Sequence, residues 1–290
     1  MAISTQVIYK EDQRYPGLLR QISDPPKQLY YKGEWNSEIF ENCLTVVGSR
    51  HMTSYGKRAT EQIVGEVARA GVTIVSGFMY GVDATAHKAA LSAGGHTIAV
   101  MPCGIERIHP EYQKDLYAKI IDTGGVVVSE WDGDSMPQLW TYPKRNRIVA
   151  GLSKATLVVE AGLESGSLIT AEFAKKFARK VFAVPGPITS EVSKGTAKLM
   201  QEGAALVQSA QDILEFYESA VQSPTFSRSK SGFSGNPLEE RIFEMLTRES
   251  VEADLIARTL QIPVSELGTM LSLMELQGII SKEGGKYYVN

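Results

Sequence analysis

Glycine and hydroxyl residues follow three short apolar runs of this sequence. They are Gly48-Ser49-Arg50, Ser76-Gly77, and the stretch 162–170 with Ser165, Gly166, Ser167 and Thr170. Where a strand turns into a helix, such residues leave backbone N–H groups unpaired at the positive end of the helix dipole. In an open α/β sheet these turns collect at the carboxyl edge. The three turns together therefore predict an anion-binding crevice, with phosphate as the natural anion.

A basic segment with one aromatic residue lies at Tyr142-Pro-Lys-Arg-Asn-Arg147. Residues 145–151 are expected to form a short helix, and cations at its N-terminus oppose the dipole, so Lys144, Arg145 and Arg147 need another reason to be there. One reason is an anionic ligand, with Tyr142 as a face on which a base stacks, because cations plus stacking faces are typical of single-strand binding. The other is a solvated basic turn beside a core aromatic residue. This segment alone leaves both open.

Metal and nucleotide-cofactor sites have no complete pattern. Asp83 and His87 are four residues apart on one expected helix face, but no third ligand has a matching spacing, so we expect a capping Asp and a structural His. The sequence has neither G-x-x-x-x-G-K-[ST] nor G-x-G-x-x-G after the first strand. We therefore predict no metal and no cofactor.

An enzymatic function has two candidate groups. Ser165 and Ser167 are nucleophiles only beside a base, and the sequence identifies none. Glu160 and Glu164 are of the type that serves as an acid and base pair, and they carry the enzyme alternative. The main prediction is that the chain has no catalytic residue.

Composition narrows the class of protein. The chain has 290 residues, 43% hydrophobic content and a formal net charge of −3, so it can bury a large core. Cys43 and Cys103 form no CxxC pair and the first residues do not resemble a signal peptide, which predicts a reduced, cytoplasmic protein. No apolar run reaches the ~18 residues that span a bilayer, so no membrane partner is expected. An acidic whole still permits a local basic stripe.

Strand and helix patterns alternate from residue 44 onward. The apolar runs are continuous in Val and Ile, which is typical of parallel strands buried on both faces. We expect strands at 44–47, 72–75, 96–100, 126–129, 155–159, 181–184 and 205–207, and helices at 57–70, 84–93 and 111–121. This predicts a doubly wound, mostly parallel α/β domain.

The chain is expected to have four parts. Residues 1–42 form an N-terminal extension whose prolines rule out a long helix, and we expect it to pack against the edge of the sheet. Residues 43–218 form the α/β domain, and the polar Ser/Gly/Pro stretch 219–236 is a linker. Residues 237–290 predict a small winged helix, with helices at 237–246, 253–260 and 265–277 followed by a hairpin.

The third of these helices lacks the chemistry of a recognition helix. Residues 265–277 contain Glu266 and Glu275 but no Lys or Arg. Cations supply most of the affinity for nucleic acid, and base edges are read by polar donors. The sequence therefore favours a packing or protein-binding role for this module over sequence-specific DNA reading.

A series of short motifs runs from about Tyr15 to about Val207. They are Val47-Gly-Ser-Arg50, Tyr55-Gly56, Ser76-Gly77, Gly81-Val-Asp83, Ala86-His87, Gly94-Gly95, Ser129-Glu130, Arg145-Asn-Arg147, Val159-Glu-Ala161, Ser165-Gly-Ser-Leu-Ile-Thr-Ala171 and Ala183-Val-Pro-Gly186. Together they resemble the DNA-processing protein A family (DprA, also called Smf), in which a C-terminal winged helix is also usual.

The resemblance implies an extended Rossmann-like domain that binds single-stranded DNA. It further implies a homodimer that protects incoming DNA and loads the recombinase RecA during natural transformation, without catalysis. Carried over by position, the DNA pocket would be lined by Gly48, Ser49, Arg50, Tyr142, Lys144, Arg145, Asn146, Arg147, Ser165, Gly166, Ser167 and Thr170.

The sequence departs from the family pattern in a few places. Phe78-Met79-Tyr80 replaces a stretch often written Leu-Ala-Arg/Lys, Ile108-His109-Pro110 replaces Tyr-Pro, and Tyr142 replaces the usual Phe. The helical domain that precedes the Rossmann-like unit in many members is not expected here. Two alternatives remain: a nucleotide hydrolase similar to phosphoribohydrolases, which grip phosphate with like turns, and a scaffold that binds a partner through the winged helix.

Overall fold

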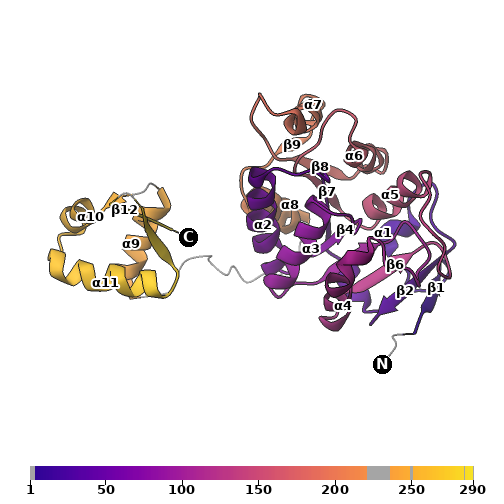
Figure 1. The fold of residues 1–290 in the computed structure, drawn as a ribbon, viewed down its shortest axis with the longest axis horizontal. Coiled ribbons are helices and arrows are strands. Elements are labelled where there is room, and N and C mark those ends of the chain that lie inside the picture. Colours follow the sequence, from indigo (N-terminus) through magenta and orange to yellow (C-terminus); the bar gives the residue numbers. More distant parts are fainter. Residues whose placement is uncertain (1–3, 221–235, 249–250, 284, 290) are drawn as a thin grey trace. The chain divides into compact units, whose positions relative to one another are not determined.

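The protein is described by a computed structural model that covers residues 4–220, 236–248, 251–283 and 285–289 (Figure 1). The chain divides into two compact units, residues 1–222 and 223–290. The first unit contains a nine-stranded sheet in the order β1-β2-β6-β5-β4-β3-β7-β8-β9.

Seven strands of this sheet run parallel. They are β3 (Cys43–Val47), β4 (Thr73–Ser76), β5 (Thr97–Val100), β6 (Val126–Ser129), β7 (Ala155–Val158), β8 (Lys180–Ala183) and β9 (Ala205–Leu206). Every residue of β3 to β7 is buried, which explains why the sequence reads as unbroken apolar runs. The predicted doubly wound sheet is confirmed.

Helices cover both faces of the sheet (Figure 1). On one face lie α2 (Ser54–Arg69), α3 (Val82–Ser92), α4 (Lys114–Asp122) and α8 (Ala210–Ala220). On the other lie α1 (Gly17–Arg20), α5 (Thr141–Gly151), α6 (Gly166–Lys176) and α7 (Lys194–Gln201), with the short 3-10 segments η1 (Ser37–Phe40), η2 (Glu111–Gln113) and η3 (Glu191–Ser193) in the connections. Successive strand residues face opposite layers: Val46 packs under α2 and α3, whereas Val47 packs in the cluster of α5 and α6.

The N-terminal segment adds strands to the sheet rather than only packing against it. β1 (Gln6–Tyr9) pairs antiparallel with β2 (Gln28–Gly33), and β2 pairs antiparallel with β6. Leu29 and Tyr31 of β2 point into the core, which gives this strand the alternating pattern of an edge hairpin. The prolines between the two strands are confined to the connection, where no ladder hydrogen bond is needed.

The chain order creates a crevice between β3 and β7. From β3 the chain proceeds through β4, β5 and β6 on one side, and then returns to β7 on the other side of β3. β3 and β7 pair in parallel, with Leu44 opposite Ala155 and Val47 opposite Val158. Loops that leave the carboxyl ends of these two strands diverge to opposite faces, and such a switch point is where open α/β sheets bind ligands.

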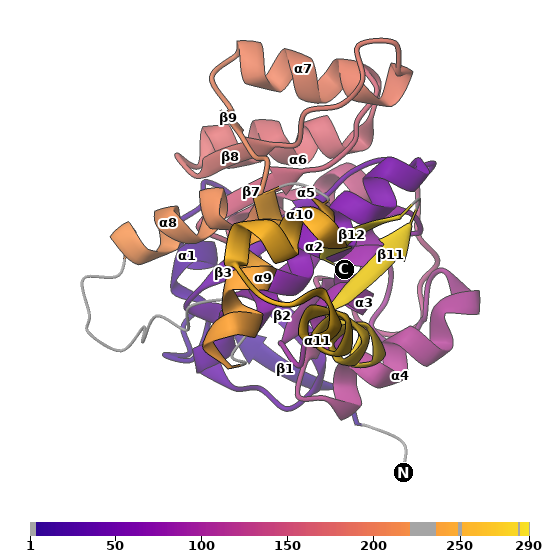
Figure 2. The ribbon, with the colours of Figure 1, turned by 90° about the vertical axis from the view of Figure 1, so that its left-hand side faces the viewer.

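The second unit has its own core. It comprises α9 (Pro237–Arg248), β10 (Val251–Glu252), α10 (Ala253–Leu260), α11 (Val264–Leu276), β11 (Ile280–Glu283) and β12 (Lys286–Val289), with strand order β10-β12-β11. Figure 2 shows its three helices with β11 and β12. Ile242, Leu267 and Met274 are fully buried within it. This is the predicted winged helix. Of the predicted linker, residues 221–235 lie outside the described residues. Among the residues that are described, no helix is long and apolar enough to cross a membrane.

Candidate functional site

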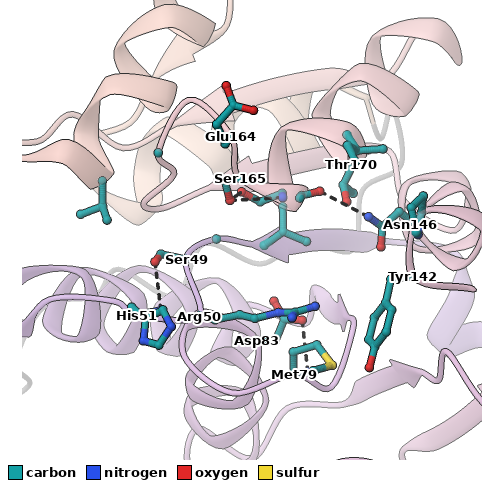
Figure 3. Close-up of a pocket in the computed structure, with 18 of the residues that line it drawn as sticks. Ser49, Arg50, His51, Met79, Asp83, Tyr142, Asn146, Glu164, Ser165 and Thr170 are labelled. Carbon is teal, nitrogen blue, oxygen red and sulfur yellow. Dashed lines mark hydrogen bonds between the residues drawn. The ribbon is translucent and has the colours of Figure 1, made fainter. Parts of the chain in front are cut away.

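A pocket of about 500 Å³ opens at the switch point between β3 and β7 (Figure 3). It draws on five segments: the turn after β3, the loop before α3, the first turns of α5, the loop and first turn of α6, and η3. Its lining comprises residues 47–51, Met79, Asp83, Tyr142, Pro143, Arg145, Asn146, Gly162, residues 164–167, Ile169, Thr170 and Val192. The three glycine and hydroxyl turns predicted to converge therefore lie around one cavity or directly behind it.

The N-terminus of α6 forms one wall of the pocket. Ser165 is its N-cap residue, and the Ser165 hydroxyl accepts a hydrogen bond from Ser167 N at 3.4 Å. The two hydroxyl oxygens are 2.7 Å apart, and Thr170 lies one turn further along. Asn146 Nδ2 donates to Gly166 O at 3.3 Å and so ties α5 to this wall (Figure 3). Backbone N–H groups, hydroxyls and the helix dipole together favour an anion here.

The turn Gly48 to Arg50 forms the opposite wall. Ser49 N donates to Glu160 O at 2.6 Å, and Val82 N donates to Ser49 O at 3.2 Å. A Cβ at Gly48 would lie 2.6 Å from Val82 Cγ2, so only glycine fits between β7 and α3. The turn is thus clamped between elements on both sides.

Glu160 stabilises a helix instead of facing the pocket. Its carboxylate accepts hydrogen bonds from Thr53 N at 2.8 Å and from the Thr53 hydroxyl at 2.6 Å, at the N-terminus of α2. Glu160 is 2% exposed and is not part of the lining, whereas Glu164 is exposed and lines the cavity. The hydrolase alternative relied on either glutamate, and only Glu164 lies in position.

Arg50 is the accessible cation of the pocket. It is exposed, and among the described residues no carboxylate lies within 4.0 Å of its guanidinium. The guanidinium carbon lies 5.2 Å from the centre of the Tyr142 ring and 5.8 Å from that of Tyr80. Its charge is therefore available to an incoming anion.

Arg145 lines the pocket from a buried position. Its Nη1 donates to the carbonyl oxygens of Gly77 and Val100, at the ends of β4 and β5, and the residue is 3% exposed. Burial lowers the pKa of Arg145 to about 10, and burial raises the pKa of Asp83 while the charge of Arg145 opposes that rise. Arg145 therefore braces the strand ends and contributes positive potential from beneath.

Lys144 and Arg147 lie elsewhere than predicted, because neither lines the pocket. Arg147 is 4% exposed and forms ion pairs with Asp24 at 2.9 Å and Glu130 at 2.6 Å. Lys144 Nζ lies 3.9 Å from Glu130 and 5.9 Å from the ring centres of Trp131 and Trp140. Both cations fasten α5 to its surroundings. The sequence does not show that Glu130 and Asp24 lie beside them, so all the residues of this segment were predicted to line the pocket together.

His87 is a buried structural side chain, as expected. Its Nδ1 lies 2.6 Å from the Thr97 hydroxyl, and burial lowers its pKa to about 3. Within the part of the chain that the structure describes, no three His, Cys, Asp or Glu side chains group as metal ligands.

Other lining residues were not predicted from the sequence. Val192 comes from η3, whose backbone accepts a hydrogen bond from Ala161 N at 2.7 Å and so returns to the pocket. Met79 and Ile169 are apolar residues without a chemical signature. His51 follows Arg50 directly in the sequence, so its position beside the Gly48 turn could have indicated it.

Sequence comparison identifies the family. Residues 6–218 match the family model described as DNA recombination-mediator protein A, and residues 227–286 match the DprA winged helix domain. The chain belongs to the DprA family. Protein Smf of Escherichia coli (strain K12) is 38% identical over 286 residues, which cover 97% of this chain and 76% of that protein. DNA processing protein DprA of Streptococcus pneumoniae is 41% identical over 207 residues, 71% of this chain and 72% of that protein.

Solved structures of DprA proteins have the same fold. The X-ray structure of DprA from Streptococcus pneumoniae superposes with a TM-score of 0.69 at 40% identity, covering 73% of this chain and 74% of that one. DprA from Helicobacter pylori, described for its single-stranded DNA binding mode, gives a TM-score of 0.67 at 28% identity, covering 76% of this chain and 98% of that one. These superpositions span about three quarters of this chain. The winged helix is a family feature through its match to the DprA winged helix domain.

Proposed function

We propose that this chain binds single-stranded DNA in the pocket between β3 and β7. The observation that carries the proposal is the pairing of the α6 N-terminus with Arg50 across one cavity. One wall has a helix dipole and hydroxyls, and the other has a cation that no carboxylate of the described residues neutralises. We expect a phosphate to bind between them. The single-stranded DNA binding mode described for the Helicobacter pylori relative supports the same class of ligand.

The site residues then have distinct roles in this proposal. Ser165, Ser167 and Gly166 present hydroxyl and backbone donors to one phosphate, and Arg50 neutralises a phosphate from the other side, close to Ser49. Tyr142 lies at the end of the cavity, half-buried, where a base can stack on its ring (Figure 3). None of these contacts reads a base edge, so binding is expected to tolerate any sequence.

Family membership extends the proposal to recombination. We infer that the protein protects incoming strands and loads RecA onto them, as a homodimer, without catalysing a reaction. RecA filament growth on a strand precoated with a competing single-strand binding protein tests this step: wild type should accelerate it and a variant that cannot bind the strand should not. Sedimentation at several concentrations tests the dimer.

Strand binding is tested by fluorescence anisotropy with a dT oligonucleotide series at two or more salt concentrations. Affinity should rise with length, fall with salt, and exceed that for a duplex of equal length. Arg50→Ala should weaken binding and reduce the salt slope by about 0.7 for the one phosphate contact it loses. Arg69→Ala is the matched control, because Arg69 is an exposed arginine roughly 20 Å from the pocket end of α2. Equal behaviour of both variants would refute the assignment.

A turnover assay tests the hydrolase alternative. A nucleotide hydrolase would cleave nucleoside monophosphates and lose that activity in Glu164→Gln. If the protein cleaves nucleoside monophosphates and does not bind a DNA strand, the hydrolase function replaces the proposed one.

A further inference from the structure

The Arg50 guanidinium, on the lower wall of the pocket, lies close to two aromatic rings, those of Tyr142 and Tyr80. Its side chain extends beneath the α6 N-terminus toward Tyr142 (Figure 3). Tyr80 lies 5.8 Å away from the guanidinium carbon, and the His51 ring meets the Tyr80 ring edge-on at 5.9 Å. The sequence pattern of the pocket motifs gave Tyr80 no role.

The backbone around Tyr80 is fixed at several points. Phe78 has a φ of 59°, which is costly for a residue with a large side chain. Its ring is fully buried, and Gln113 Nε2 donates to its carbonyl at 2.9 Å. Met79 N donates to the Asp83 carboxylate at 3.3 Å. The buried ring and these hydrogen bonds hold an unfavourable backbone conformation, and Tyr80 follows it beside Arg50.

Gly81 presses this loop against the backbone of Arg50. Its φ is 79°, and a Cβ there would lie 2.6 Å from Arg50 O and 2.7 Å from Arg50 Cα. Val82 N donates to Ser49 O in the same contact. Tyr80 and Arg50 are therefore held next to each other by main-chain contacts as well as by their side chains.

The surroundings of Arg50 make this support necessary. Among the described residues no carboxylate lies within ion-pair distance of the Arg50 guanidinium. Burial lowers the pKa of the nearby Arg145, and the positive charge of Arg50 lowers it further. An aromatic face attracts a guanidinium without neutralising it, whereas a carboxylate would compete with the ligand. Two rings can thus orient Arg50 and leave its full charge for an anion.

We propose that Tyr80 is a positioning residue for strand binding: together with Tyr142 it holds the Arg50 guanidinium in place over the pocket, and it acts on DNA only through Arg50. This inference rests on the proposed function, because the guanidinium is positioned for a strand phosphate. The aromatic pair orders a long side chain before the strand arrives, which reduces the entropy lost on binding.

A double-mutant cycle tests the inference with the full-length chain and a dT oligonucleotide. Tyr80→Leu should weaken binding roughly threefold to tenfold, and Tyr80→Phe should bind like wild type because the phenyl face still attracts the cation. In an Arg50→Ala background, Tyr80→Leu should change affinity less than about twofold, since the interaction is already lost. Tyr80→Leu should also lower the salt slope, which loosened packing alone would not do.

The controls separate the possible failures. Tyr9→Leu alters an exposed tyrosine on edge strand β1 and should bind like wild type. If Tyr80→Leu does not fold, Tyr80→Met keeps an apolar side chain without the ring and takes its place in the cycle. Additive losses from Tyr80 and Arg50, or no loss from Tyr80, would overturn the inference while the proposed function stands. Absence of strand binding by wild type would overturn the proposed function itself.

Discussion

At the scale of single residues, partners rather than residue type decide what each arginine does. Arg50 has two aromatic neighbours and remains available, Arg145 donates to strand-end carbonyls, and Arg147 is enclosed by carboxylates. From the sequence all three appeared equivalent, because the Asp24 partner of Arg147 is 123 residues away. Contact with DNA is therefore expected from Arg50 and structural effects from Arg147.

Arg147→Ala should destabilise the fold while leaving the salt dependence of strand binding unchanged. Removing the guanidinium leaves Glu130, whose side chain is 17% exposed, without its closest partner. We expect a loss of about 3 kcal/mol in the free energy of unfolding, at the low end for a broken buried pair because Asp24 is exposed. Urea unfolding measures it, with Arg69→Ala as a control that should change stability by less than about 0.5 kcal/mol. A stable variant with a reduced salt slope would instead place Arg147 on the DNA.

His87 should make stability depend on pH. The Thr97 hydroxyl donates to Ile74 O, so His87 Nδ1 must be the donor to Thr97. Nε2 is left buried with no hydrogen-bond partner among the described residues. Protonation of Nε2 is therefore disfavoured in the folded state, where burial lowers the pKa to about 3, while the unfolded state binds the proton near pH 6.5.

The free energy of unfolding should therefore decrease as the pH falls. Above pH 6.5 both states carry a neutral His87, and below it only the unfolded state gains a proton, so the free energy of unfolding falls by up to roughly 1.4 kcal/mol per pH unit toward pH 3. Urea unfolding at pH 7 and pH 5 should show this loss in wild type and a smaller loss in His87→Asn. Equal losses in the two proteins would exclude His87 as the source.

At the scale of elements, tight contacts between loops and strand ends shape the pocket. The loop before α3 reaches the Ser49–Arg50 turn only because residue 81 has no side chain. The position of Arg50 is thus determined by a neighbouring element and not by its own turn alone.

Gly81→Ala should lower both stability and strand affinity. The added Cβ meets backbone atoms of Arg50 and requires a positive φ, so the loop or the turn must move. We expect a loss of about 2 kcal/mol or more in unfolding free energy. Gly65→Ala, in the interior of α2 with nothing within 4 Å of the new Cβ, should instead stabilise by roughly 0.5 to 1 kcal/mol and leave affinity unchanged. A Gly81 variant as stable as wild type would show that the loop adapts.

The sequence predicted the elements that carry strong patterns. Runs such as 126–129 are apolar on both faces, and the structure places strands at these positions. The hairpin of β1 and β2 was not predicted, because Gln28 to Gly33 alternate only weakly and prolines precede them. The glycine and hydroxyl turns located the pocket, since they depend on local chain geometry. The positions of the Lys144 and Arg147 side chains depend on ion pairs with Glu130 and Asp24, and residue spacing does not predict these pairs.

At the scale of the molecule, the chain has two units with separate hydrophobic cores, and the pocket lies in only one of them. The winged helix packs around Ile242, Leu267 and Met274, and the pocket residues all belong to the α/β unit. On α11, Leu273 and Leu276 are 50% and 85% exposed, which is an apolar surface unlike that of a helix that binds phosphates.

A chain that ends at residue 218 should bind a dT oligonucleotide within about twofold of the full chain, because it keeps every lining residue of the pocket. Anisotropy titrations of both proteins under the same salt conditions measure this. A large loss of affinity on truncation would assign strand contacts to the C-terminal unit.

The pairing of β3 with β7 has a consequence for folding order. These adjacent strands are separated by more than 100 residues of chain, which must form β4, β5 and β6 or remain as an open loop before the two can meet. Contacts of such long sequence separation form slowly. During synthesis, Arg50 and its turn emerge long before Ser165 does. The nascent N-terminal half therefore has a cation without its opposite wall, and the pocket is complete only after the centre of the sheet has closed.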